Sequence, residues 1–313
     1  MKKVLLITFC ALLIFIMCQS EKESKNQEEN SDVIANIKKQ NFNSKCELHI
    51  LDRKDNNLNI SILLDLSDRI ELPQQQAKDS AYILSIAKAF NNHVLRKKLV
   101  LLYDKMEVYF EPAPTNPTIN QLAEELKVSY VKGVSKDKWI PETIKRYGTL
   151  PGQIYAQSRA IAKTEGYSGS DIWGFFKNHV KDYCMEACNR NILVILTDGY
   201  LYDKAGLKKE GNLTSYLTPQ SLTKLKLNKS DWKTEIKDRG LGFIPATQGL
   251  EDLEVLVLGI QSQNSNHPYA QEIIENYWET WLTQMNVKRF KIKSADLPSH
   301  IEKVIMNFIS NKN

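Results

Sequence analysis

Three runs of aliphatic and β-branched residues constrain the fold of this chain more than any other feature. They cover residues 58–66 (LNISILLDL), 191–196 (NILVIL) and 253–260 (LEVLVLGI). Continuous apolar runs of this length are typical of strands buried on both faces, as in a parallel sheet. The chain is also 42% hydrophobic, which excludes a wholly disordered protein, and its five cysteines in 313 residues exclude a small disulfide-stapled fold.

Segments with helical spacing of apolar residues alternate with these strands. We expect a further strand at 287–292 and helices over residues 74–94, 119–126, 171–187, 269–285 and 298–309. Residues 99–110 are predicted to form two strands joined by a turn at Asp104 and Lys105. Residues 127–168 have no clear assignment. Repeated strand–helix units imply right-handed crossovers. The sequence therefore predicts an α/β fold with a doubly wound, mostly parallel sheet and helices on both faces.

The first residues predict export and a membrane anchor. Lys2 and Lys3 precede an apolar stretch, residues 4–17, that has the length of a signal-peptide core and is shorter than a spanning helix. Cys18 follows at once and resembles the lipid-modified cysteine of bacterial lipoproteins, although residues 15–17 lack the small residues of that pattern. An uncleaved signal anchor is the alternative. Both predict a domain outside the cytoplasm, in the bacterial cell envelope, either periplasmic or surface-exposed.

The domain organisation follows from composition. Residues 1–17 are assigned to a lipoprotein-type signal peptide. Residues 18–57 begin with a polar and charged stretch and are assigned to a flexible tether. Residues 46–52 of this tether are a candidate edge strand. Residues 58–313 form one predicted domain with an insert at about 200–250, and no second domain is expected.

Oxygen-bearing side chains follow the predicted strands. Asp65, Ser67 and Asp68 come after the first run, Asp198 follows the second, and Ser170 precedes a predicted helix. Binding sites in parallel sheets lie at the carboxyl ends of the strands, so these side chains are expected at one edge. Hydroxyl and carboxylate oxygens are the ligands that hard cations such as Mg²⁺ prefer.

Four short motifs occur here in a fixed order: Asp65-x-Ser67, Gly169-Ser170-Asp171, Thr197-Asp198-Gly199 and Leu258-Gly259-Ile260. In this order and context they resemble the von Willebrand factor A (vWA) domain, over roughly residues 58–309. The resemblance implies a Rossmann-like α/β fold and a metal-ion-dependent adhesion site. It further implies Asp65, Ser67, Ser170 and Asp198 as ligands of Mg²⁺ or Mn²⁺, directly or through water, with a partner's carboxylate completing the shell.

Arg69 departs from the family pattern, which has a serine ligand there. A guanidinium has five donors and no acceptor, so it cannot ligate a cation. It could lie across Asp65 and Asp198 in the ion's place, and Asp68 could supply an oxygen instead. The alternative to a metal site is a satisfied polar network of Asp65, Arg69 and Asp198 on a module that binds partners without metal.

The insert carries much of the positive charge. Residues 203–239 hold nine Lys or Arg against five Asp or Glu. This predicts either a basic rim for an acidic partner, a phosphate or an anionic lipid, or a solvated, locally helical excursion. Nucleic acid is not expected, because the aromatic residues lack the spacing of a base-stacking platform.

The predicted function is a membrane-anchored, extracytoplasmic vWA-like module that mediates protein–protein interaction. The alternative is a metal-assisted hydrolase that uses Asp65 and Asp198. The sequence has no Gly-x-Ser-x-Gly elbow and no glycine-rich phosphate loop after the first strand. Cys46, Cys184 and Cys188 allow one internal disulfide or free thiols, and the sequence does not decide between them.

Overall fold

The computed structural model describes residues 46–167, 169–264 and 266–311 and divides the chain into two compact units, residues 1–52 and 53–313. The described part of the first unit contains helix α2 (Leu48–Leu51), whose turn is closed by the amides of Ile50 and Leu51 on the carbonyl of Glu47. The edge strand expected at 46–52 is therefore wrong. The signal peptide, Cys18 and residues 19–45 of the tether lie outside the described residues.

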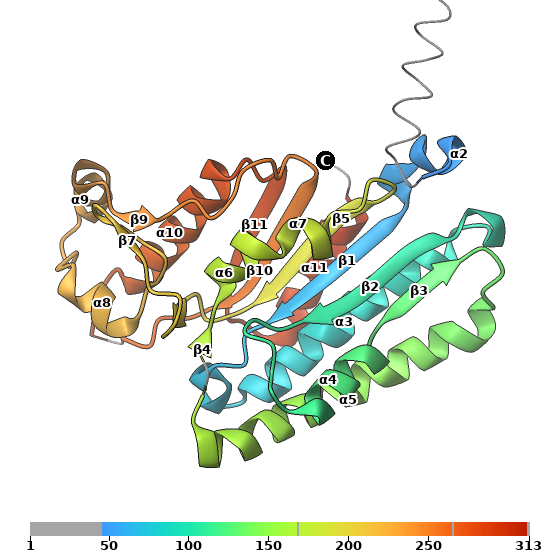
Figure 1. The fold of residues 1–313 in the computed structure, drawn as a ribbon, viewed down its shortest axis with the longest axis horizontal. Helices are drawn as coiled ribbons and strands as arrows, with labels where there is room; N and C mark the ends of the chain where they lie inside the picture. The colour runs from blue at the N-terminus through green and yellow to red at the C-terminus, as the bar shows by residue number, and fades with distance from the viewer. Residues whose placement is uncertain (1–45, 168, 265, 312–313) are drawn as a thin grey trace, which may run out of the picture. The chain divides into compact units, whose positions relative to one another are not determined.

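The second unit contains a six-stranded sheet (Figure 1). Its order is β11-β10-β5-β1-β2-β3. Neighbouring strands are parallel except for β3, which runs antiparallel to β2. The strands are β1 (Leu58–Leu64), β2 (Tyr103–Tyr109), β3 (Val128–Val131), β5 (Arg190–Leu196), β10 (Leu253–Ile260) and β11 (Arg289–Ser294). The predicted α/β class with a largely parallel sheet is confirmed.

Side chains of the central strands alternate between two hydrophobic cores. In β5, Ile192 and Val194 belong to one core and Leu193 and Ile195 to the other. Helices α3 (Gln75–Leu95), α4 (Pro117–Glu125), α5 (Lys136–Glu165) and α11 (Pro298–Ser310) contribute to the first core. Helices α6 (Ile172–Asn178), α7 (Val180–Cys184) and α10 (Ala270–Gln284) contribute to the second (Figure 1). Both faces of the sheet are thus covered, which explains the absence of polar alternation in β5 and β10.

Two expectations about local structure need correction. Residues 99–110 form the short 3-10 helix η3 (Leu99–Leu101) and one strand, β2, that runs through the expected turn. Asp104 is buried in that strand because its carboxylate accepts hydrogen bonds from the Leu58 amide (2.8 Å) and from Lys97 Nζ (2.7 Å). The expected helix over 171–187 is divided at His179 into α6 and α7.

The insert folds as a set of short elements. These are β6 (Tyr202–Asp203), β7 (Lys209–Glu210), β8 (Leu213–Thr214), α8 (Pro219–Lys224), α9 (Trp232–Arg239) and β9 (Gly242–Phe243). Leu222, Trp232 and Ile236 are buried in the same core as α10, so this segment packs onto the domain. Strand β6 also pairs with β4 (Gly169–Ser170), which brings the insert to the carboxyl edge of the sheet.

Candidate functional site

A pocket of about 340 Å³ lies at the carboxyl ends of β1 and β5, beside β4. We call it the edge pocket. Its lining includes Ser67, Asp68, Ser170, Asp198, Tyr202 and Gln263. Four of the side chains expected at this edge, Ser67, Asp68, Ser170 and Asp198, are therefore brought together. The cause is topological, because parallel strands end at the same edge and β4 is held there by its pairing with β6.

Asp65 lies behind this lining and is 1% exposed. Its Oδ1 accepts a hydrogen bond from the amide of Ser67 (2.9 Å), and its Oδ2 accepts one from the hydroxyl of Thr197 (2.8 Å). Its own amide donates to the carbonyl of Leu196 at the end of β5 (3.1 Å). Asp65 thus joins the ends of β1 and β5 and orients the loop that carries Ser67.

Asp198 is the buried carboxylate of the edge pocket, with 3% of its surface exposed. It accepts hydrogen bonds from the amide of Tyr200 (3.2 Å) and from Nε2 of Gln263 (2.8 Å). Burial and the neighbouring charge of Asp65 raise the pKa of Asp198 to about 7, although Arg69 and the two hydrogen bonds act in the opposite direction. The pocket therefore holds a carboxylate that is poorly compensated when it is ionised.

Ser170 is the most informative hydroxyl of the pocket. It is 2% exposed, and its Oγ has no hydrogen-bond partner among the residues that the structure describes. Its place is fixed by the backbone, since Ser170 pairs with Tyr202 across β4 and β6. A buried polar group without a partner costs roughly 1–3 kcal/mol, so this hydroxyl is a candidate for contact with a ligand.

Arg69 occupies a different place from the one expected. It belongs to the 3-10 helix η2 (Asp68–Glu71) and is 1% exposed. Its Nη1 and Nη2 donate to the carboxylate of Asp79 on α3, at 2.9 and 3.3 Å, and Nη1 also donates to the backbone carbonyl of Asp65 at 3.1 Å. In the described structure the guanidinium makes no hydrogen bond to the carboxylates of Asp65 and Asp198, and Arg69 is not among the residues that line the edge pocket. Burial lowers the pKa of Arg69, but the charge of Asp79 and the other acidic groups outweighs burial and raises it.

Asp79 is the central group that sequence reasoning missed. Besides Arg69 it accepts hydrogen bonds from Nε2 of Gln75 (2.9 Å) and from the hydroxyl of Tyr155 on α5. An aspartate among the polar positions of an amphipathic helix looks solvent-facing, so the pattern gave no signal for this role. Gln263 was also missed, because it lies in the loop three residues beyond β10.

The donor set of the edge pocket suits a hard cation. Ser67, Ser170 and Asp198 offer only oxygen atoms, as Mg²⁺ and Mn²⁺ sites require. Within the described ranges, no group of three or more His, Cys, Asp or Glu side chains is placed to hold a metal ion. Any cation here would therefore depend on the serine hydroxyls, and the unpaired Oγ of Ser170 is compatible with that role.

The hydrolase alternative would use Asp65 and Asp198 with a metal ion, with Ser67 as a candidate nucleophile that needs a base close to it. The residues that line the edge pocket include no histidine, lysine or cysteine. Cys184 is a free thiol, and burial raises its pKa to about 12. Among the described residues that line the edge pocket, Asp198, whose pKa is raised to about 7, is the candidate base for Ser67.

No protein-family model matches this chain, and no curated protein matches it. Among solved structures, it is similar to the pilus adhesin SpaC from Lactobacillus rhamnosus GG, with 14% identity and a TM-score of 0.39 over 81% of this chain and 30% of the adhesin. It is also similar to proximal thread matrix protein 1 from the mussel byssus, with 10% identity and a TM-score of 0.35 over 82% of this chain and 48% of that protein. The matches span less than half of either neighbour, and neither is strong enough to assign a family.

Proposed function

We propose that this chain is a vWA-like protein-binding module, anchored through Cys18 at the bacterial cell envelope, that recognises a protein partner through the edge pocket. The observation that carries the proposal is the buried Oγ of Ser170, which has no partner among the described residues and lies in the same pocket as Ser67 and Asp198. These three residues belong to three of the four motifs that resemble the vWA pattern. No described helix is long and apolar enough to cross a membrane, so the anchor is proposed from residues 1–18 alone.

The pocket is built to receive a group from outside the chain. Ser170 Oγ needs a partner, and the carboxylate of Asp198 is desolvated beside Asp65. Both conditions are relieved by a cation or by a ligand that donates hydrogen bonds. Arg69 provides only part of this relief. Its charge lowers the pKa of Asp198, but its Nη1 and Nη2 donate to Asp79 and to the Asp65 carbonyl.

A divalent cation, Mg²⁺ or Mn²⁺, fits this requirement. Ser67, Ser170 and Asp198 would hold it, with Asp65 behind them. When bound, such an ion attracts and orients a carboxylate of the partner. We therefore still expect the partner to carry an acidic group, which would bind through the cation.

Photo-crosslinking in the membrane-anchored protein tests the proposal. A photoreactive residue at Tyr202, which is 43% exposed and lines the edge pocket, should crosslink one protein partner. Asp198→Ala and Ser170→Ala should each reduce that crosslink at least tenfold. Asp238→Ala, which removes an exposed carboxylate on α9, is the matched control and should leave it unchanged. Equal crosslinking in all three variants would exclude the edge pocket as the recognition site.

A further inference from the structure

Four large apolar side chains are exposed near the amino edge of the sheet, where β1 and β2 begin. They are between 41% and 62% exposed: Leu95, Leu99, Val100 and Val131. Single exposed apolar side chains are common on protein surfaces, whereas a group of them marks a site of interaction. Exposed cations stand next to them in the chain, namely Arg96, Lys98 and Lys132. We call these seven residues the amino-edge patch.

The segments that carry the patch are held together by the fold. Helix η3 leads into β2, whose first residue, Tyr103, pairs with Val131 at the end of β3, and η3 also contacts β3. Leu95 is the last residue of α3. Its carbonyl accepts a hydrogen bond from Nζ of Lys136 (3.2 Å), at the start of α5. The ends of α3 and β3 and the starts of β2 and α5 thus meet at one edge.

The patch has a positive charge that the domain does not neutralise. Residues 95–103 and 131–136 contain five Lys or Arg and no Asp or Glu. Two of the five act within the domain, since Lys97 pairs with the buried Asp104 (2.7 Å) and Lys136 binds backbone carbonyls at the end of α3. The other three are exposed and make no ion pair with any residue that the structure describes: Arg96, Lys98 and Lys132.

The chain enters the second unit beside this patch. Helix η1 (Lys54–Asn56) opens the unit and directly precedes β1. The carbonyl of Asn56 accepts a hydrogen bond from Nζ of Lys97 (2.8 Å) and lies 3.0 Å from Nε2 of His93, in the last turn of α3. The segment that joins the domain to the proposed anchor at Cys18 therefore starts at the same edge as the patch.

We propose that the amino-edge patch lies on the anionic lipid surface of the membrane that carries the anchor. The three cations would meet lipid phosphates, and the aliphatic side chains between them would enter the interface. The anchor favours lipid over a soluble occupant, because it holds this edge near the bilayer and makes the contact intramolecular. The inference uses the anchor of the proposed function but neither its protein partner nor the edge pocket.

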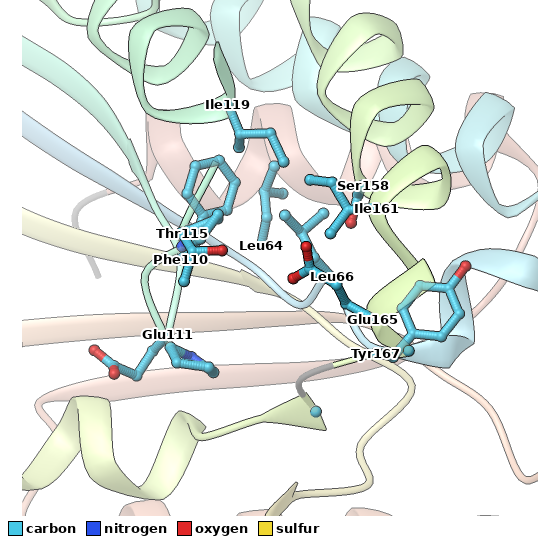
Figure 2. Close-up of a pocket in the computed structure, with 14 residues that line it drawn as sticks. Leu64, Leu66, Phe110, Glu111, Thr115, Ile119, Ser158, Ile161, Glu165 and Tyr167 are labelled. Carbon is cyan, nitrogen blue, oxygen red and sulfur yellow. The ribbon is translucent and has the colours of Figure 1, made fainter. Parts of the chain in front are cut away.

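Contact with lipid at this edge would orient the domain. Figure 2 shows the opposite end of β1 and β2, where Leu64 and Phe110 line a pocket of about 150 Å³. Ser67 and Asp198 of the edge pocket also follow the carboxyl ends of their strands. A strand of this length spans roughly 20 Å, so the two edges are well separated. With the patch on lipid, the edge pocket would face away from the bilayer and remain open to a partner.

Fluorescence of the full chain on vesicles tests this inference. An environment-sensitive fluorescent amino acid replaces Val100, and the vesicles are either phosphatidylcholine alone or a mixture with about one-third phosphatidylglycerol. The emission should shift to shorter wavelength on the anionic vesicles and stay unchanged on the neutral ones. The same probe at the exposed Asp238 of α9 should not respond to either vesicle.

Two charge-reversal variants locate the contact. The patch variant combines Arg96→Glu, Lys98→Glu and Lys132→Glu, and it should reduce the emission shift about fivefold, because each cation near the anionic surface contributes to the attraction. The control variant makes the same change of charge at exposed lysines of the insert and should leave the shift unchanged: Lys204→Glu, Lys224→Glu and Lys229→Glu. Unchanged urea unfolding curves will show that both variants are folded.

Flotation of the same samples separates this inference from the anchor. Flotation with both vesicles but no emission shift would overturn the patch and leave the anchor standing. Flotation and shift with anionic vesicles alone would support the patch and remove the anchor, and flotation with neither would overturn both. Equal loss of the shift in the two variants would reveal diffuse attraction, and a shift that grows with protein concentration without lipid would identify a second copy as the occupant. Either of these results would also overturn the inference.

Discussion

Replacing Asp79 with alanine should destabilise the domain severely, because it leaves the guanidinium of Arg69 buried without its counter-ion. Both side chains of this pair are 0% exposed. The carboxylate of Asp79 accepts two hydrogen bonds from Arg69, one from Gln75 and one from the hydroxyl of Tyr155. A single substitution therefore removes the acceptor of three side chains from three helical segments, η2, α3 and α5.

The expected magnitude follows from the burial of the pair. Removing one partner of a buried ion pair costs about 3–5 kcal/mol. For a domain of this size each kcal/mol shifts the thermal midpoint by about 2–4 °C, so the midpoint should fall by roughly 10 °C. Removing both charges together, in Arg69→Met with Asp79→Leu, should recover most of that loss, because no charge is then left unpaired.

Urea unfolding followed by circular dichroism at neutral pH measures these free energies, with Asp238→Ala as a surface control. The single Asp79→Ala variant should unfold at lower urea with an unchanged slope. Two results would refute the reasoning. One is a loss below about 1 kcal/mol for Asp79→Ala, and the other is a double variant as unstable as the sum of the two single variants.

Two further predictions concern the edge pocket, and a third concerns the turn after β5. Because the pKa of Asp198 is raised to about 7, the folded state binds more protons than the unfolded state between about pH 4 and 7, and stability falls as pH rises through that window. In EDTA, Asp198→Asn should therefore be more stable than wild type by at least about 1 kcal/mol at pH 8 and show no such gain at pH 4, measured by urea unfolding. Isothermal calorimetry should detect Mn²⁺ binding to wild type and at least tenfold weaker binding to Ser170→Ala; no heat with wild type would remove the cation from the proposal. Gly199→Ala should cost about 1–3 kcal/mol, since φ is +96° and the new Cβ would lie 2.5 Å from Ile274 Cγ2, whereas Gly211→Ala, with open space around it, should cost less.

The sequence predicted the parts of this fold that depend on continuous burial. Strands β1, β5 and β10 are buried along their whole length, so most of their residues are apolar. The convergence of Ser67 and Asp198 was predictable for a related reason, because parallel strands deliver the residues that follow them to one edge, whereas Ser170 is held there by the pairing of β4 with β6. Neither inference required knowledge of any side-chain direction.

Helix α5 was not predicted because its local signals conflict with its packing. Pro141 and Pro151 lie inside this thirty-residue helix, and proline in a helix interior removes a backbone hydrogen bond. The buried side chains of Tyr147, Ile154 and Tyr155 stabilise the helix through tertiary contacts instead. Tertiary packing of this kind overrides local propensity, and it cannot be seen in a single sequence.

The pairing of Arg69 with Asp79 also depends on tertiary packing, and it matters more for function than helix α5 does. From the sequence, the nearest carboxylates were Asp68, Glu71 and Asp65, yet the guanidinium pairs with Asp79, which the folding of α3 brings against η2. Had Arg69 bridged Asp65 and Asp198, the charges of the site would have been neutralised within the chain. Instead Asp198 retains a raised pKa, and the hydroxyl of Ser170 has no partner among the described residues. A cation or a hydrogen-bond donor from outside the chain would relieve both groups, and this is the physical basis of the proposal that a partner is recognised at this edge.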